Sequence, residues 1–415
     1  MNKKYLGYES PHKRNLFLLC WVAYFSTYIC RLNFSAVMPE LQKGEVFSES
    51  QIALVSSAFF ICYGAFQFVS GILGDKLDTR LMVFWGLLIS SVSNILIFFN
   101  HSFYSLLFLW AINGIVQSMV WSPILKIASV NFNEVEKKKF GIDISTTVPI
   151  GTLLSYGISL LTLIFLPWQY VFLTCGLTEL LISFYWFIGT KNLKQSDAEK
   201  EKSKALEVAP MSAKKTIKIL LAGGLFFLLI PIAIQGTLKD SVTQWIPTFL
   251  GDAFGSKTTF SLALTMILPI INVTGAYFAK AVDKKVKNEI TTSLIFFVIS
   301  AVFLTILMLF GSKNIIIALI SMAAITNCMF AINVMLITMV PLAFASTGRV
   351  STISGFLNAM AYIGCGILNI FAGKILEISS SWSVLFIMWL ILAVIAIFVS
   401  AISVPLWKKT KAKKL

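Results

Sequence analysis

The chain has few charged residues. Only 13% of its 415 residues are Asp, Glu, Lys or Arg, whereas 57% are hydrophobic and the mean hydropathy is +0.83. A soluble protein could not bury so large an apolar share in its interior. The scarcity of charge therefore excludes an ordinary soluble domain and indicates a membrane protein.

Residues that carry enzyme chemistry are also scarce. His12 and His101 are the only histidines, and the six cysteines fall in apolar stretches without metal-ligand spacing. The sequence shows no nucleophile beside a base, no metal-binding cluster and no phosphate-binding loop. We therefore expect no enzyme activity, no metal and no cofactor, and we interpret the cysteines as small packing residues without disulfides.

Long apolar stretches fill most of the sequence. Each has about 20 residues, enough to cross a hydrocarbon core of roughly 30 Å as a helix, whereas barrel strands would have about 10 residues of alternating polarity. We predict an all-α membrane protein with twelve transmembrane helices. The predicted spans are 15–38, 50–73, 81–100, 104–128, 141–165, 168–190, 216–246, 258–281, 290–310, 315–341, 350–374 and 381–406.

The formal net charge of +15 would suit nucleic acid, but its distribution favours a membrane. If both termini are cytoplasmic, the outer loops hold Lys43, Lys257 and Lys313, and most other basic residues fall in inner loops and tails. This follows the positive-inside rule, and the inner basic residues would attract anionic lipid head groups. We predict a monomeric multi-pass protein of the cell inner membrane that contacts lipid, has both termini in the cytoplasm and binds no nucleic acid.

The two halves of the chain repeat the same landmarks. Each half has a basic residue inside an apolar helix, a proline eight residues later and an acid–base pair further on. We predict two pseudo-symmetric six-helix halves, 1–190 and 216–415, joined by a polar cytoplasmic linker, 191–215. The matching residues, all separated by the same interval, are Arg31 and Lys239, Pro39 and Pro247, Asp75 and Asp283, and Lys76 and Lys284.

Both basic residues lie on a polar face of their predicted helices. Tyr24, Tyr28 and Arg31 are spaced by three or four residues in the first helix, and Gln235 and Lys239 are four apart in the seventh. Such faces line a cavity or bond one helix to another. Further candidates for a cavity lining come from the second and eleventh helices: Tyr63, Gln67, Asn358 and Tyr362.

A buried cation needs a partner. Even on a lenient scale, a charge at the centre of a membrane helix costs about 2.5–3.5 kcal/mol. The acids within the predicted spans are Asp143, Glu179 and Asp240. Asp240 should soften the charge of Lys239 without neutralising it face to face, because consecutive helical residues diverge by about 100°. We therefore predict that Arg31 and Lys239 bind a small organic anion, and a phosphate ester would match two positive charges.

One loop resembles a signature of the major facilitator superfamily. The segment GILGDKLDTR, residues 71–80, resembles the loop between the second and third helices of that superfamily, and AKAVDKKVKNE, residues 279–289, resembles a weaker second copy that keeps Asp283. The resemblance implies that Gly71 allows close helix approach and that Asp75 and Arg80 form ion pairs favouring one access state. It also implies a substrate site near the bilayer midplane between two halves.

Four further segments resemble the organophosphate:phosphate antiporters, which include glycerol-3-phosphate and hexose-6-phosphate transporters. The resemblance implies exchange of a phosphate ester for inorganic phosphate by alternating access, with Arg31 as a phosphate-binding arginine and Lys239 in place of a second one. Lys126 matches a basic position, and Gln67 replaces a lysine of the glycerol-phosphate branch. The histidine of the fifth helix in that branch has no counterpart, which argues against glycerol 3-phosphate. The segments are YICRLNFSAVMPEL (28–41), WSPILK (121–126), WIPTFL (245–250) and GRVSTISGFLNAMAYIG (348–364).

Two alternative functions remain open from the residues. The protein could be a proton-coupled symporter of a carboxylate or sugar acid, with Asp143, Glu179 or Asp240 as the proton carrier. It could also be a sensor that binds a sugar phosphate without transporting it. Uptake driven by a pH gradient would favour the symporter, and binding without uptake would favour the sensor.

Overall fold

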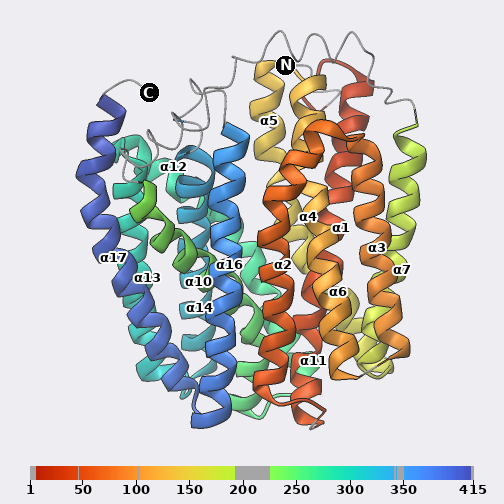
Figure 1. Cartoon of the computed structure of the whole chain (residues 1–415). Coiled ribbons are helices and arrows are strands. Elements are labelled where there is room, and N and C mark those ends of the chain that lie inside the picture. The colour runs from red at the N-terminus through yellow and green to blue at the C-terminus, as the bar shows by residue number, and fades with distance from the viewer. Residues whose placement is uncertain are drawn as a thin grey trace. The chain divides into compact units, whose positions relative to one another are not determined.

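The protein is almost entirely helical. Of the predicted linker 191–215, Lys191 lies among the described residues and the rest lies outside them. In the described part, short turns join the helices and no strand is present (Figure 1). The computed structural model describes residues 6–44, 46–100, 102–191, 225–340, 343 and 350–412.

Eleven helices in this part of the chain are long and apolar enough to cross a membrane. They correspond to eleven of the twelve predicted spans. The twelfth corresponds to α10 (Leu225–Phe254), which has 30 residues and carries Lys239 and Asp240 near its middle. The prediction of an all-α membrane protein is confirmed, with eleven of the twelve predicted spans matched by helices long and apolar enough to cross a membrane.

The chain forms two compact units. The boundary runs through α1 (Pro11–Lys43) and α2 (Glu49–Lys76), so the end of α1 and the start of α2 belong with the C-terminal helices. The observed units therefore differ from the predicted halves at this hairpin. Unit 1 is Met1–Val37 with Phe66–Leu206, and unit 2 is Met38–Ala65 with Glu207–Leu415.

Unit 1 differs from the prediction at its fifth span. The predicted span 141–165 begins too early, because a separate short helix, α5 (Glu134–Ile144), precedes α6 (Thr147–Phe165). The α5 helix contains EVEKKKFGIDI, which is too short and too charged to cross a membrane. The other helices of unit 1 are α3 (Thr79–Phe99), α4 (Phe103–Asn131) and α7 (Gln169–Gly189). Of these, α3 packs against α4 and against α7.

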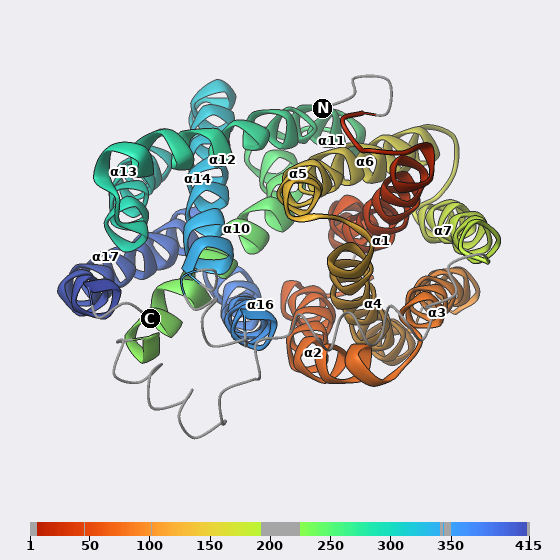
Figure 2. The ribbon, with the colours of Figure 1, turned by 90° about the horizontal axis from the view of Figure 1, so that it is seen from above.

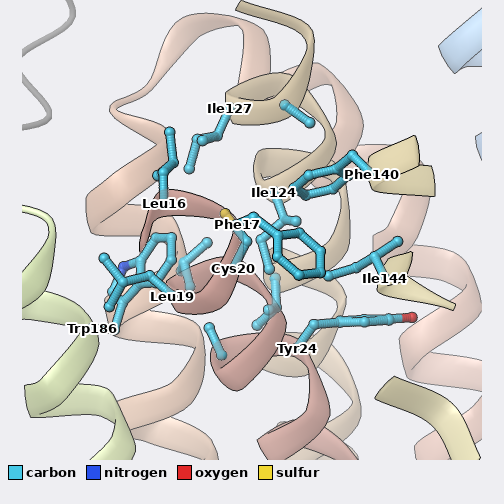
Figure 3. Close-up of a cluster of buried hydrophobic side chains, with 14 of the residues drawn as sticks. Leu16, Phe17, Leu19, Cys20, Tyr24, Ile124, Ile127, Phe140, Ile144 and Trp186 are labelled. Carbon is cyan, nitrogen blue, oxygen red and sulfur yellow. The ribbon is translucent and has the colours of Figure 1, made fainter. Parts of the chain in front are cut away.

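A hydrophobic cluster holds the start of α1 within unit 1 (Figure 3). Phe17 from α1 meets Phe140 from α5 edge to face, with ring centroids 5.5 Å apart. Ile124 of α4 and Trp186 of α7 complete the cluster and are fully buried. The short helix α5 therefore contributes Phe140 and Ile144 to the core of unit 1.

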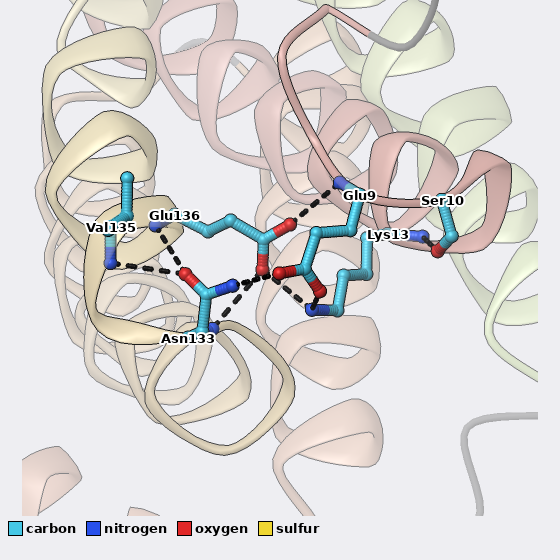
Figure 4. Close-up of polar contacts among 6 residues, drawn as sticks. All are labelled: Glu9, Ser10, Lys13, Asn133, Val135 and Glu136. Atoms are coloured by element: carbon cyan, nitrogen blue, oxygen red, sulfur yellow. Dashed lines mark hydrogen bonds and ion pairs between the residues drawn. The ribbon is translucent and has the colours of Figure 1, made fainter. Parts of the chain in front are cut away.

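A polar cluster ties the segment before α1 to the start of α5 (Figure 4). Glu136 is 3% exposed, and Lys13 donates to it and to Glu9, with both distances 2.7 Å. The backbone amides of Glu9 and Asn133 also donate to Glu136, at 2.9 Å and 3.2 Å. Burial alone would raise the pKa of Glu136, but these donors outweigh burial and hold the pKa below its usual value.

Unit 2 is built around α10. This helix packs on α14 (Ile315–Asn333), α16 (Val350–Ser379) and α17 (Trp382–Ala412), and α13 (Glu289–Phe310) packs on α14 and α17 (Figure 2). The predicted span 315–341 matches α14 together with a π-helical turn that directly continues it, since Ile315–Met339 form one span. The remaining elements are this turn, η2 (Val334–Met339), with α11 (Thr258–Thr265) and α12 (Ile267–Val286).

The cysteines behave as predicted. All six are free thiols, five are buried and Cys62 is partly buried. They fill small spaces between helices, as expected of cysteine in an apolar core.

Candidate functional site

Arg31 follows a break in α1. Cys30 has φ −89° and ψ 16°, which interrupts the regular helix. Its carbonyl oxygen accepts hydrogen bonds from the side-chain amides of two α4 residues, Asn113 at 2.7 Å and Gln117 at 3.3 Å. The amides of α4 therefore satisfy a polar group within the membrane, which would be costly to leave unpaired.

The Arg31 side chain is buried within unit 1, with 6% of its surface exposed. Its Nε donates to Gln117 Oε1 at 3.2 Å, and its guanidinium carbon lies 4.8 Å from the centroid of the Tyr28 ring. Hydrogen bonding and a cation–π contact thus orient the guanidinium. Gly151 of α6 makes room for Tyr28, because a Cβ at this glycine would lie 2.7 Å from both Tyr28 Cβ and the Phe25 carbonyl oxygen.

A buried glutamate lies at the far end of the hydrogen-bonded side chains that begin at Arg31. Glu179 of α7 is fully buried, and its Oε2 lies 2.6 Å from the hydroxyl of Ser90 on α3. The same hydroxyl is 2.7 Å from Asn113 Oδ1 and accepts from Gln117 Nε2 at 3.2 Å. Three neutral side chains therefore join Glu179 to the site of Arg31.

The other predicted residues of unit 1 have different surroundings. Tyr24 packs in the hydrophobic cluster, with its ring centroid 4.5 Å from that of Trp121. Lys126 is partly buried on α4, and Gln67 is 2% exposed on α2. The structure therefore brings Tyr28 directly to Arg31 and places Tyr24 among apolar side chains.

Lys239 has an acidic neighbour in unit 2. Its Nζ lies 3.4 Å from Asp240 Oδ2, and the Lys239 side chain is 15% exposed. Asp240 thus contacts Lys239 more directly than expected, because a long lysine side chain can reach an adjacent carboxylate despite the divergence of the two residues. Lys239 Nζ also lies 5.5 Å from the ring centroid of Tyr362 and 5.9 Å from that of Phe330.

Through Tyr362, Lys239 is connected to a second predicted tyrosine. The rings of Tyr63 and Tyr362 have centroids 4.6 Å apart, and Asn358 lies one turn before Tyr362 on α16 and is partly buried. Gln235 instead donates to the Met329 carbonyl oxygen of α14 at 3.1 Å. The structure thus groups Lys239 with the two tyrosines, while Gln235 joins two helices.

A second buried polar network lies beyond Lys239 on α10. Asn369 of α16 accepts from Trp245 Nε1 at 2.7 Å and donates to Ser56 Oγ at 2.9 Å. Ser56 in turn donates to Gln244 Oε1, 2.5 Å away. This network holds neutral side chains that join α2, α10 and α16 of unit 2.

The predicted loop-signature residues mostly hold helix ends. Arg80 donates to the carbonyl oxygens of Thr190 and Lys191, at 3.3 Å and 3.2 Å, and so caps the end of α7. Asp283 accepts from Thr292 Oγ1 at 3.1 Å, which joins α12 to α13. A Cβ at Gly71 would have no described atom within 4 Å, so among the described residues no close helix approach is seen at this glycine. The side chain of Asp75 lies outside the described residues.

Asp143 lies in α5 rather than in a transmembrane helix. It forms an ion pair with Lys139, and the Tyr8 hydroxyl donates to it at 3.4 Å. Burial and the Asp143 carboxylate raise the pKa of Tyr8. In the described part of the chain, no group of three His, Cys, Asp or Glu side chains could hold a metal ion.

Sequence analysis missed Ser90 as a site residue. It belongs to a run of small polar residues, Ser90, Ser91, Ser93 and Asn94, inside an apolar helix. That run was the available signal. Periodicity alone could not show that Ser90 faces both Glu179 and the amides of α4.

Comparison with known proteins identifies the family. The model of the Major Facilitator Superfamily matches residues 20–368. The membrane sensor protein UhpC of Escherichia coli is 35% identical over 25% of this chain and 24% of its own. A probable hexose phosphate transport protein of Chlamydia trachomatis is 24% identical over 44% of this chain and 40% of its own length. The glycerol-3-phosphate transporter of Bacillus subtilis is 26% identical over 60% of each.

These matches span less than two thirds of those relatives. Solved structures agree on the fold: an inward-facing bacterial homologue of the lysosomal transporter Spinster has a TM-score of 0.73 and 13% identity, covering 98% of each chain. A D-xylose–proton symporter has a TM-score of 0.70 and 15% identity, covering 97% of this chain and 99% of its own. The similar proteins are transporters and a sensor rather than enzymes. The chain belongs to the Major Facilitator Superfamily, and its relatives agree with the organophosphate:phosphate antiporter family within it.

Proposed function

We propose that the protein is a secondary transporter that exchanges a phosphate ester of the sugar-phosphate class for inorganic phosphate by alternating access. The observation that carries this proposal is Arg31, a buried guanidinium in a transmembrane helix, oriented by Gln117 and Tyr28. Its burial costs about 2.5–3.5 kcal/mol even on a lenient scale, so its presence indicates use. A bound anion would offset that cost.

The chemistry of the two cations favours a phosphate group. The planar fork of Arg31 suits two oxygens of a phosphate, and Lys239 offers a compact charge with three donors. A phosphate ester carries nearly two negative charges near neutral pH, so each cation on its own is suited to bind such a group. The names of two relatives, a hexose phosphate transport protein and a glycerol-3-phosphate transporter, support the same class.

Other residues would assist these two cations. We assign Tyr28, Tyr63 and Tyr362 as hydrogen-bonding or ring contacts of the substrate. Asn358, Gln67 and Lys126 are further contacts, whereas Tyr24 and Gln235 hold the helices that carry the cations. Arg80 and Asp283 would set the balance between access states through the helix ends that they join.

The exposed surface of the helices supports a lipid environment. Phe165 and Leu181 of unit 1 are 79% and 73% exposed, and Ile378 of unit 2 is 85% exposed. Such large apolar side chains are stable in contact with lipid tails. The many basic residues in the predicted inner loops and tails support a monomer in the inner membrane with both termini in the cytoplasm.

Exchange in liposomes tests the proposal. Purified protein is placed in vesicles loaded with inorganic phosphate, and uptake of labelled glucose 6-phosphate is followed. We expect uptake to require internal phosphate and to disappear in Arg31→Ala. The control is Arg14→Ala, which removes another arginine of the same helix. The Arg14 side chain donates hydrogen bonds to the side chain of the neighbouring Asn15. Unchanged uptake by Arg31→Ala would overturn the proposal.

The same assay separates the alternatives. A hexuronate transporter of Bacillus subtilis is 24% identical over 64% of this chain, so glucuronate is the carboxylate to compare. Glucuronate uptake driven by a pH gradient without internal phosphate would favour the proton-coupled symporter. Binding of glucose 6-phosphate without any uptake would favour a sensor, as the UhpC relative is named.

A further inference from the structure

We propose that Glu179 is a proton-binding site linked to the anion site at Arg31. When an anion binds at Arg31, a proton from solution adds to Glu179, and the two ligands strengthen each other's binding. The inference rests on the proposed function, because it requires an anion at Arg31. It assigns a role to a buried carboxyl group that anion exchange alone does not use.

The hydrogen-bond count around Ser90 points to this role. The Ser90 hydroxyl has one hydrogen but two close acceptors, Glu179 Oε2 at 2.6 Å and Asn113 Oδ1 at 2.7 Å. If Glu179 is ionised, Ser90 donates to the carboxylate, and Asn113 Oδ1 keeps the longer bond from Gln117 Nε2 at 3.2 Å. If Glu179 carries a proton, it donates to Ser90 Oγ, and Ser90 turns its hydrogen to Asn113. In both protonation states Ser90 Oγ, Glu179 Oε2 and Asn113 Oδ1 are therefore hydrogen-bonded, whereas Glu179 Oε1 is buried without a hydrogen-bond partner among the described residues.

Gln117 connects this group to Arg31. Its Oε1 accepts from Arg31 Nε at 3.2 Å, and its Nε2 faces Ser90 and Asn113, each at 3.2 Å. A change in the position of the guanidinium would therefore move the amide that bonds the Ser90 hydroxyl. Buried networks of this kind pass such changes on because their bonds depend on one another.

The charges around Glu179 give the direction of the linkage. The titratable and charged groups near it are Arg31 and Cys30 on α1 and Cys175 on α7 itself. Neutral Ser and amide side chains face it from α3 and α4, and α6 carries Tyr156. Arg31 is thus the positive charge acting on Glu179 among these groups.

An anion at Arg31 would weaken that positive field and add negative charge nearby. Both effects favour the protonated form of Glu179, and by reciprocity a proton on Glu179 favours anion binding. The covalent bond that forms is the O–H bond at Glu179 Oε2, and no other covalent bond forms or breaks in the protein. In exchange of two anions the proton crosses in both directions, whereas one-way anion movement would carry a proton along.

Calorimetric titration in detergent measures the linked proton. Inorganic phosphate and glucose 6-phosphate are titrated into protein in two buffers with different ionisation enthalpies, which gives the number of protons taken up. Phosphate also titrates near neutral pH, so the quantity that decides is the difference between wild type and Glu179→Gln. We expect wild type to take up as much as about one proton more, and its affinity to fall up to about tenfold per pH unit relative to the variant.

Two further variants keep the test decisive. Ser90→Ala removes the donor that stabilises ionised Glu179, so the glutamate should stay protonated without anion and the extra uptake should shrink. Glu289→Gln is the matched control, because Glu289 is a buried glutamate of unit 2 that accepts from Trp407 Nε1 at 2.8 Å. It should take up the same number of protons as wild type. If Glu179→Gln does not fold, Ser90→Ala carries the measurement.

The outcomes separate this inference from the proposed function. Anion binding with equal proton uptake in wild type, Glu179→Gln and Ser90→Ala would overturn the linkage and leave exchange standing. Failure of wild type to bind either probe would overturn both. Extra uptake that is lost in Glu179→Gln and kept in Glu289→Gln would support the linkage.

Discussion

The two units match in sequence at Arg31 and Lys239, yet each cation meets its acid differently. In unit 1, neutral side chains stand between Arg31 and Glu179. In unit 2, Asp240 lies 3.4 Å from Lys239, and the nearby buried network of Ser56, Gln244 and Asn369 contains no acid. A cation in direct contact with its acid forms a nearly neutral pair. A cation that neutral side chains separate from its acid keeps a stronger positive field. We therefore expect Arg31 to dominate anion recognition and Lys239 to adjust it.

The aromatic partners of the two cations also come from different helices. In unit 1, Tyr28 lies on the same helix as Arg31, and Gly151 on α6 makes room for it. In unit 2, the position matching Tyr28 is Gly236, which packs against the Ala361 backbone, and Tyr362 on α16 supplies the ring. In unit 1 the cation's own helix carries the ring and the other helix carries the glycine, whereas in unit 2 these positions are reversed. The repeat therefore keeps the contact between cation and ring, but a different helix supplies the ring.

The largest expected difference lies in anion binding by the two cations. Arg31→Ala should weaken binding of glucose 6-phosphate by about 100-fold. The substitution removes two charge-assisted hydrogen bonds to the anion, each of roughly 1.5–3 kcal/mol, and other contacts would offset only part of that loss. Removing the whole neutral pair, in Lys239→Ala/Asp240→Asn, should cost less than about tenfold. Calorimetric titration of both variants measures the difference. Equal losses would contradict the ranking of the two cations.

A clash at the two glycines should separate stability from binding. Gly151→Ala forces a methyl group against Tyr28 and the Phe25 backbone, so we expect a loss of about 1–3 kcal/mol in stability together with weaker anion binding. Gly236→Ala meets the Ala361 backbone and should lower stability while affecting binding less. Thermal unfolding and titration of both variants check this. Stronger loss of binding in Gly236→Ala would show that Lys239, rather than Arg31, controls recognition.

An acid-sensitive contact is expected in unit 1, at Glu136. Its folded pKa lies below the unfolded value, so ionised Glu136 stabilises the fold above the unfolded pKa, and this contribution is lost as the pH falls through the folded pKa. Glu136→Gln should lower stability by about 1–2 kcal/mol at neutral pH and reduce the change on acidification. Thermal unfolding at neutral and acidic pH measures both effects.

The control for this contact is Glu377→Gln, which changes an exposed glutamate of unit 2. It should leave unfolding at both pH values unchanged. If Glu136→Gln lost as much stability on acidification as wild type, the polar cluster around Glu136 would not be the acid-sensitive contact.

Hydropathy and length were enough to predict the helices, because every transmembrane helix must satisfy its own backbone and be apolar over about 20 residues. They could not separate α5 from α6. In the sequence, the apolar residues Phe140 and Ile144 of α5 run on into the apolar stretch of α6, although they belong to a separate short helix that joins the core of unit 1.

The candidate site was predicted less completely. Helical periodicity placed Tyr28 beside Arg31 correctly, because both lie on one face of one helix. It could not pair Arg31 with Gln117 or Ser90 with Glu179, which are 86 and 89 residues apart. It also did not foresee how directly Asp240 contacts Lys239, because the direction of a Cβ atom does not limit where a flexible lysine side chain ends.

The smallest expected effect tests whether Asp240 restrains Lys239. Asp240→Asn keeps the size of the side chain but removes the charge that lies 3.4 Å from Lys239 Nζ, so the lysine can turn toward an anion. We expect binding of glucose 6-phosphate to tighten about threefold, a gain of under 1 kcal/mol, in line with a partly exposed ion pair. The gain should vanish in Lys239→Ala/Asp240→Asn. Weaker binding by Asp240→Asn would instead mean that the carboxylate positions Lys239 for the anion, and the two units would then use their acids in the same way.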